Sequence, residues 1–157
     1  MSNAPSTATA TPSSIIPRRV DVLIDHYGQS HQNQRNEAIH FAAIPLIMLS
    51  LFGLIFALHP WLAYSFVAAS MVYYARLSAV FFFSMLIWSA LIIGLVHAMG
   101  EQVLVISVAI FVGAWVAQFV GHKIEGKKPS FLEDIQYLWI GPLFVLSKVF
   151  VRLGIKW

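Results

Sequence analysis

The residues best suited to chemistry in this chain are histidines that flank its long apolar runs. The segment Asp25–Pro45, DHYGQSHQNQRNEAIHFAAIP, contains His26, His31 and His40, and His122 ends another apolar run much later. Imidazole is the commonest metal ligand near neutral pH, and three or four of them suit Zn, Fe or Cu. The chain has no cysteine, so a metal would have only nitrogen and oxygen ligands. Taken singly, a histidine at such a position is more often a hydrogen-bonded side chain at the membrane interface than a metal ligand, so only the group as a whole favours a metal site.

The composition predicts how these residues are positioned. Hydrophobic residues make up 59% of the 157 positions and charged residues only 11%. The apolar residues form blocks of about 15 to 23, close to the length that crosses a bilayer as helix. A buried soluble core is the alternative but is not expected, because a chain this short could not surround so many apolar helices with a polar shell. The net charge of +3 comes from a few loops, so nucleic-acid binding is not expected.

The order of the blocks predicts an all-α integral membrane four-helix bundle. Residues 1–19 are rich in Ser, Thr, Ala and Pro and are expected to be a disordered tail, and residues 20–157 form one membrane domain. A short amphipathic helix over Val20–Tyr27 should lie at the membrane surface. Asn33 or Asn36 could cap the helix that follows. The predicted spans are residues 38–58, 61–75, 77–99 and 103–120.

The ends of the spans carry further expectations. Gly121 and His122 should terminate the fourth span, and Gly94 and Gly113 could let helices approach closely. Residues 131–153 are expected to form an amphipathic helix, broken at Gly141-Pro142, that lies on the membrane surface or re-enters it.

Basic residues indicate the orientation of the spans. With four crossings, all ten Lys and Arg fall on one side, which the positive-inside rule makes cytoplasmic. His26, His31, His40 and His122 share that side, whereas His59 and His97 lie a bilayer thickness of roughly 30 Å away.

Two polar motifs resemble a known family. The first is Tyr27-x3-His31-x-Asn33-x2-Asn36-x2-Ile39-His40, and the second is Gln118-Phe119-Val120-Gly121-His122 followed by Lys127-Lys128-Pro129. In order and spacing they are similar to the small membrane proteins typified by the fungal endoplasmic-reticulum 2-hydroxy fatty acid dioxygenase, which works in phytosphingosine degradation. The resemblance covers residues 20–154.

The resemblance implies an Fe(II)-dependent α-oxidation, in which a 2-hydroxy long-chain fatty acid reacts with O2 and loses one carbon. The family's catalytic, metal-binding histidines correspond to His31, His40 and His122, and His26 or Glu125 is a candidate further ligand. The substrate would chelate the iron through its carboxylate and α-hydroxyl, with its chain among the apolar helices.

Polar neighbours of these histidines have expected roles as well. A second group of residues should fix the histidine tautomers, and basic residues near the same membrane face could attract the substrate carboxylate or contact lipid headgroups. The candidates are Tyr27, Asn33, Asn36 and Gln118 for the first role and Arg35, Lys127 and Lys128 for the second.

Three other functions have to be compared with the sequence. Membrane di-iron hydroxylases need around eight histidines in tight boxes, more than this chain has on one side. A b-type cytochrome needs histidines inside facing spans, whereas these lie at the ends. The third is a non-catalytic membrane protein that binds lipid or a partner and whose histidines are structural. The absence of a retrieval signal slightly favours a bacterial inner membrane over endoplasmic reticulum.

Overall fold

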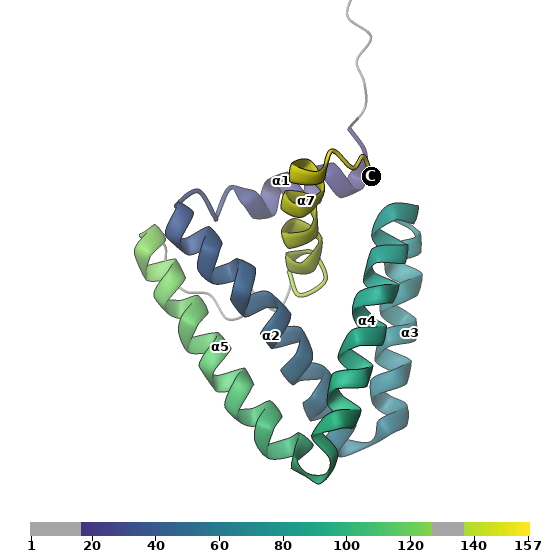
Figure 1. Ribbon diagram of the computed structural model, residues 1–157. Coiled ribbons are helices and arrows are strands. Elements are labelled where there is room, and N and C mark those ends of the chain that lie inside the picture. Colours follow the sequence, from purple (N-terminus) through teal and green to yellow (C-terminus); the bar gives the residue numbers. More distant parts are fainter. Residues whose placement is uncertain (1–16, 127–136) are drawn as a thin grey trace, which may run out of the picture.

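A computed structural model describes residues 17–126 and 137–157, and within these ranges the chain contains helices and no strands (Figure 1). The expected disordered tail falls almost wholly outside the described residues, as does the first part of the expected C-terminal helix. The helices are α1 (Arg19–Gly28), α2 (Gln34–Leu58), α3 (Pro60–Ala75), α4 (Ala79–Met99), the short 3-10 helix η1 (Gly100–Gln102), α5 (Val103–Glu125) and α7 (Gly141–Leu153).

Local sequence signals set most of the helix boundaries. The side chain of Asn33 accepts a hydrogen bond from the backbone N–H of Arg35 at 2.9 Å and so caps α2, as predicted. His59 accepts from the backbone N–H of Trp61 at 3.3 Å, and Pro60 begins α3, where its missing N–H costs nothing. Glycines with positive φ end the later helices, namely Gly100 (54°), Gly126 (76°) and Gly154 (68°).

α5 does not end at Gly121 and His122 as expected, but continues to Glu125. Position 121 requires glycine because α5 crosses α2 closely at this point. A Cβ at Gly121 would overlap the Asn36 side chain and lie 3.2 Å from the His40 ring. Gly53 of α2 faces Ser107 of α5, and a Cβ at Gly53 would overlap the Ser107 side chain. Gly94 and Gly113, which were expected to allow close packing, have open space where a Cβ would stand. The close pair is therefore α2 and α5, which run antiparallel (Figure 1).

The four long helices form two pairs that diverge like the arms of a V (Figure 1). α2 and α5 make one arm, α3 and α4 make the other, and the arms meet near Leu58 and η1. A compact four-helix bundle is therefore not confirmed.

α7 lies at the open end between the arms, beside α1 (Figure 1). Its side chains Leu143, Phe144 and Phe150 are buried in a cluster that also contains Tyr27 and Phe81. Burying each such side chain contributes about 1.5–3 kcal/mol. The apolar face of this helix is therefore buried within the protein, and α7 closes the wide end of the V.

α1 confirms the predicted amphipathic helix, because Val20, Ile24 and Tyr27 are buried on one face. That face packs against α7 rather than standing open to a membrane surface.

Two helical stretches are long and apolar enough to cross a membrane, namely α2 and the continuous stretch Ala79–Glu125 that contains α4 and α5. At 16 residues, α3 is shorter than the roughly 20 residues that a perpendicular crossing requires.

Candidate metal centre

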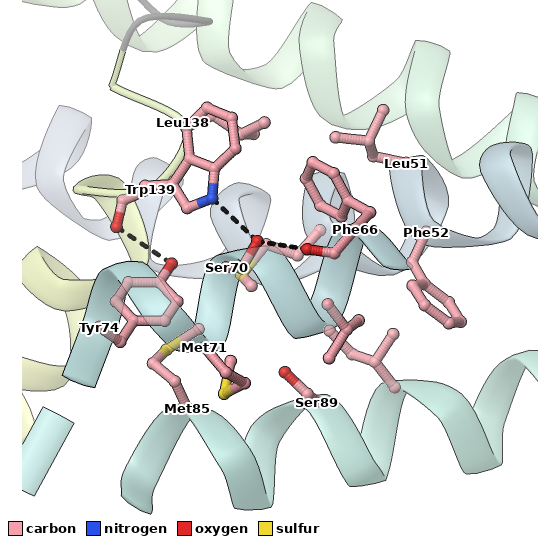
Figure 2. A pocket seen from close by; sticks show the side chains of 13 residues that line it. Leu51, Phe52, Phe66, Ser70, Met71, Tyr74, Met85, Ser89, Leu138 and Trp139 are labelled. Atoms are coloured by element: carbon pink, nitrogen blue, oxygen red, sulfur yellow. Dashed lines mark hydrogen bonds between the residues drawn. The ribbon is translucent and has the colours of Figure 1, made fainter. Parts of the chain in front are cut away.

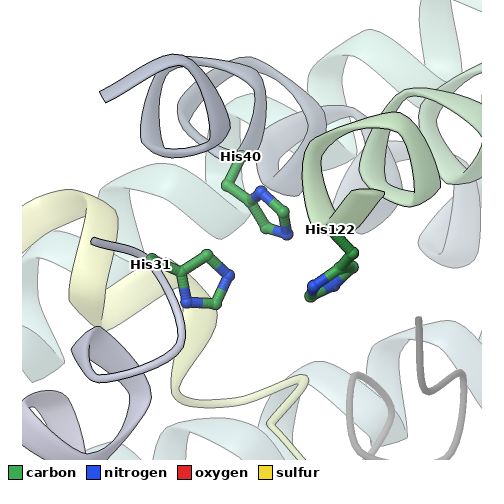
Figure 3. A group of neighbouring side chains, drawn as sticks. All are labelled: His31, His40 and His122. Atoms are coloured by element: carbon green, nitrogen blue, oxygen red, sulfur yellow. The ribbon is translucent and has the colours of Figure 1, made fainter. Parts of the chain in front are cut away.

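Three histidines from separate parts of the chain meet at the open end of the α2–α5 arm. His31 lies in the loop between α1 and α2, His40 in the second turn of α2, and His122 in the last turn of α5. Their rings turn toward one another in Figure 3, with centroids 4.3 Å apart for His31 and His40 and 4.9 Å apart for His40 and His122. All three are buried, at 4%, 0% and 6% exposure.

The spacing of the ring nitrogens suits a shared metal ion. One nitrogen from each of the three rings lies within 4.8 Å of the other two. Ligands at about 2.1 Å from one ion stand roughly 3–3.5 Å apart in tetrahedral or octahedral geometry, so small rotations of the rings would bring these nitrogens to bonding distance. Among the described residues, no other group of histidine and acidic side chains has this spacing.

Backbone carbonyl groups fix the tautomers of two of the rings. His31 Nδ1–H donates to the carbonyl oxygen of Tyr27 at 2.9 Å, and His40 Nδ1–H donates to the carbonyl oxygen of Asn36 at 3.0 Å. A carbonyl oxygen only accepts, so the proton must be on Nδ1, and in a neutral ring Nε2 then carries the lone pair. This is the arrangement that orients a histidine ligand toward a metal.

Tyr27 also holds His31 through its ring. The two rings are stacked with centroids 4.3 Å apart and an interplanar angle of 18°. Phe144 of α7 lies beside both rings, with centroid distances of 5.2 Å to Tyr27 and 5.7 Å to His31. α7 thus supports the three-histidine group, and His31 is held by α1 and α7 as well as by its loop.

The two further ligand candidates, Glu125 and His26, lie outside the three-histidine group. Glu125 accepts hydrogen bonds from the backbone N–H groups of Gln32 and Asn33 at 2.9 Å and from the Asn36 side chain at 3.0 Å, so its carboxylate joins α5 to the start of α2. His26 is exposed, lies beside Tyr137 and is outside the three-histidine group. Neither Glu125 nor His26 belongs to the group with metal-ligand spacing.

The carboxyl group of Glu125 lies beyond the apolar part of α5. Its partial burial acts to raise the pKa, but the hydrogen bonds from Asn33, Asn36 and Gln32 act in the opposite direction, as does the nearby His31 ring when it is protonated. The result is a pKa below the ordinary value, so Glu125 is ionised at neutral pH.

Polar neighbours support the group in ways that differ from the prediction. The backbone carbonyls of Tyr27 and Asn36, not their side chains, bond the histidines, and Asn33 serves as the helix cap. Gln118 is buried one turn before His122. Arg35 is exposed in the first turn of α2, whereas Lys127 and Lys128 lie outside the described residues.

A comparison with protein families matches residues 18–153 to the 2-hydroxy-palmitic acid dioxygenase Mpo1-like family. The chain belongs to this family. No curated protein and no solved structure matches it. The match spans both histidine-bearing segments and so includes all three residues of the histidine group. The family resemblance noted from the two motifs is thereby confirmed.

Proposed function

We propose that this protein is an Fe(II)-dependent dioxygenase that shortens 2-hydroxy long-chain fatty acids by one carbon. The observation that carries the proposal is the buried group of His31, His40 and His122, two of which have their lone pairs directed by backbone carbonyls. The family name supplies the substrate class.

The donor set fits ferrous iron. Three neutral imidazoles leave the ion with its full double charge and with open coordination positions. A bound ferrous ion would supply the redox chemistry with O2 and a site for the carboxylate and α-hydroxyl of the acid. The protein's contribution is to hold the rings in place, to keep Nδ1 protonated on His31 and His40, and to bury the reacting end away from water.

The overall reaction balances with one O2. The carboxyl carbon of the 2-hydroxy acid leaves as CO2, the hydroxyl-bearing carbon becomes the carboxyl carbon of the shorter acid, and water is the third product. The two carbons together lose four electrons, which is what the reduction of one O2 requires. No further reductant is needed.

We also propose that the protein lies in a membrane with this site near one face. α4 and α5 expose large apolar side chains, among them Ile87 at 73% and Val105 at 73%, which in water would form a surface prone to association. The start of α2, the end of α5, α1 and the turn between α3 and α4 lie at one end of the molecule, and the α2–α3 and α4–α5 turns lie at the other (Figure 1). His59 belongs to the α2–α3 turn and His97 to the last turn of α4. Four crossings, a cytoplasmic site and a bacterial inner membrane belong to the same proposal.

The test is an assay of the purified protein loaded anaerobically with ferrous ion. On addition of O2 and 2-hydroxy-palmitic acid, we expect the acid one carbon shorter and an equal amount of CO2. His31→Ala, His40→Ala and His122→Ala should each abolish turnover. His97→Ala is the control, because His97 bonds Tyr64 at 2.8 Å at the opposite end. Protein that retains no iron and forms no shortened acid would instead support a lipid- or partner-binding role with structural histidines.

A further inference from the structure

Two apolar cavities lie in the part of the chain that the structure describes, one of them beside the histidine group. This nearer one lies between α1, α2, α5 and the start of α7 and is lined by Tyr27 and Gln118, among others. The farther one lies between α2, α3 and α4 (Figure 2). Met48 and Leu138 line both cavities. The two spaces therefore adjoin each other and together outline a path through the interior of the V.

The near end of this path begins at the metal centre. The Tyr27 ring, which lines the nearer cavity, is stacked on the His31 ring at 4.3 Å. Gln118, which also lines this cavity, precedes His122 by one helical turn. Tyr27 and Gln118 therefore place the cavity next to the histidine group, where it can receive the chain of a molecule held by the three rings.

The wall of the farther cavity is suited to hydrocarbon. The described residues that line it include no charged side chain. Of the polar side chains among these residues, those of Ser70, Tyr74 and Trp139 form hydrogen bonds, as Figure 2 shows. Trp139 Nε1–H donates to Ser70 Oγ at 2.9 Å, the Ser70 hydroxyl donates to the Phe66 carbonyl at 2.8 Å, and the Tyr74 hydroxyl donates to the Trp139 carbonyl at 3.2 Å. Groups paired in this way leave an apolar surface, which favours an alkyl chain over a polar ligand.

The length of the path matches a long chain. α2 runs beside it from His40 at the metal centre to Phe52 on the wall of the farther cavity. Twelve residues of α-helix rise about 18 Å, which is comparable to an extended long-chain acyl group.

We propose that these two cavities bind the alkyl chain of the fatty-acid substrate, and that Val67 and Ile92 at the far end limit its length. The inference rests on the proposed function for the nature of the substrate, and on the two adjoining cavities for its position. Val67 and Ile92 lie about 10 Å further from the open end of the V than Tyr74 and Met85, which line the same cavity on the same two helices.

Photochemical labelling tests this position without requiring turnover. The probe is 2-hydroxy-palmitic acid with a photoreactive diazirine at its methyl end, added to the full-length protein in detergent and followed by peptide mass spectrometry. We expect the label on the α3 and α4 segments that carry Val67 and Ile92. Excess unlabelled 2-hydroxy-palmitic acid should remove it and excess phospholipid should not. Label on outward residues such as Val72 and Leu91, or displacement by phospholipid alone, would overturn the proposal.

Substitutions test the limit on chain length. Val67→Phe fills the far end, so labelling by the long probe should fall about tenfold or more, while a shorter homologue is labelled as before. Val72→Phe is the matched control, because it makes the same change on the exposed side of α3. Ser89→Leu narrows the cavity from α4 and should have the same effect, which provides a second test if Val67→Phe does not fold. Equal loss for both probe lengths in the folded variants would contradict the proposed limit.

Failure of this inference and failure of the proposed function give different results. Label in the cavity with no acid shortening by iron-loaded protein would sustain the binding path and reject the reaction. Acid shortening with the label elsewhere would sustain the reaction and reject the path.

Discussion

The carboxylate of Glu125 and the side chain of Asn36 join the last turn of α5 to the first turn of α2. Asn36 Nδ2–H donates to Glu125 Oε2 at 3.0 Å, and the same carboxylate also accepts the backbone N–H groups of Gln32 and Asn33. Asn36 is completely buried, and its backbone carbonyl oxygen accepts the hydrogen bond from His40 Nδ1–H. The contact therefore connects the two segments that carry the metal-binding candidates, although Glu125 itself is outside the three-histidine group.

Replacing Glu125 by Ala should weaken metal binding without removing a ligand. The change leaves the N–H groups of Gln32 and Asn33 without this acceptor and removes the contact to Asn36, so the start of α2 can move relative to α5. Loss of a group that orients ligands costs about 10–100-fold in metal affinity. Competition between the protein and a ferrous chelator measures the change. Glu101→Ala is the control, since Glu101 is exposed in η1 at the other end, and equal affinities for the two variants would refute this role for Glu125.

The same carboxylate predicts a dependence of stability on pH. Because the pKa of Glu125 is lower in the folded protein than its ordinary value of 4.5, its contribution to stability is fully present above about pH 4.5. The contribution is lost as the pH falls through the folded-state pKa, where the carboxylate becomes protonated in both states. The measurement is the difference in Tm between wild type and Glu125→Gln in nonionic detergent. This difference should shrink below pH 4.5, and a difference that is constant down to pH 3 would exclude the linkage.

The helices could be predicted well because their signals are local. Apolar blocks, the cap at Asn33 and the His59-Pro60 break give α2 and α3 close to their observed limits. The order of the blocks also places His31, His40 and His122 at one end. Four consecutive antiparallel helices, α2 to α5, bring the start of the first and the end of the fourth to the same side. Their convergence to within 4.8 Å goes beyond this, because it depends on how closely α2 and α5 pack.

The details that the sequence did not reveal are contacts between segments. A glycine at position 121 is equally consistent with a helix end and with a close crossing, and only the position of Asn36 on the neighbouring helix distinguishes them. The carbonyls that bond His31 and His40 have no sequence signature beyond a spacing of four residues. α7 was expected to lie on the membrane surface or to re-enter the membrane, because its sequence shows an apolar face but not what covers that face. Here Tyr27 and Phe81 help to cover it.

Two glycines of α5 should respond in opposite ways to alanine. At Gly121 a Cβ would overlap Asn36 and press on the His40 ring, so Gly121→Ala should force the helices apart and lower both Tm and metal affinity. At Gly113 a Cβ meets nothing within 4 Å, and alanine in a helix interior is favoured by about 0.5–1 kcal/mol, so Gly113→Ala should keep or raise Tm. Thermal unfolding and chelator competition on both variants test the pair. A Gly121→Ala protein with unchanged metal affinity would contradict the close approach of α2 and α5 at the site.

Metal content should separate the three grouped histidines from the other three. His31→Ala, His40→Ala or His122→Ala removes one of three ligand nitrogens that lie within 4.8 Å of one another, so each protein should lose bound ferrous ion. Cobalt(II) substitution provides a second readout, because the visible spectrum reports the ligand set even in an inactive protein. His26→Ala should keep both metal and spectrum, because His26 is exposed and packs beside Tyr137 instead. Loss of metal in His26→Ala would show that the ligand set extends beyond the buried group, and full retention in His122→Ala would show that α5 does not contribute a ligand.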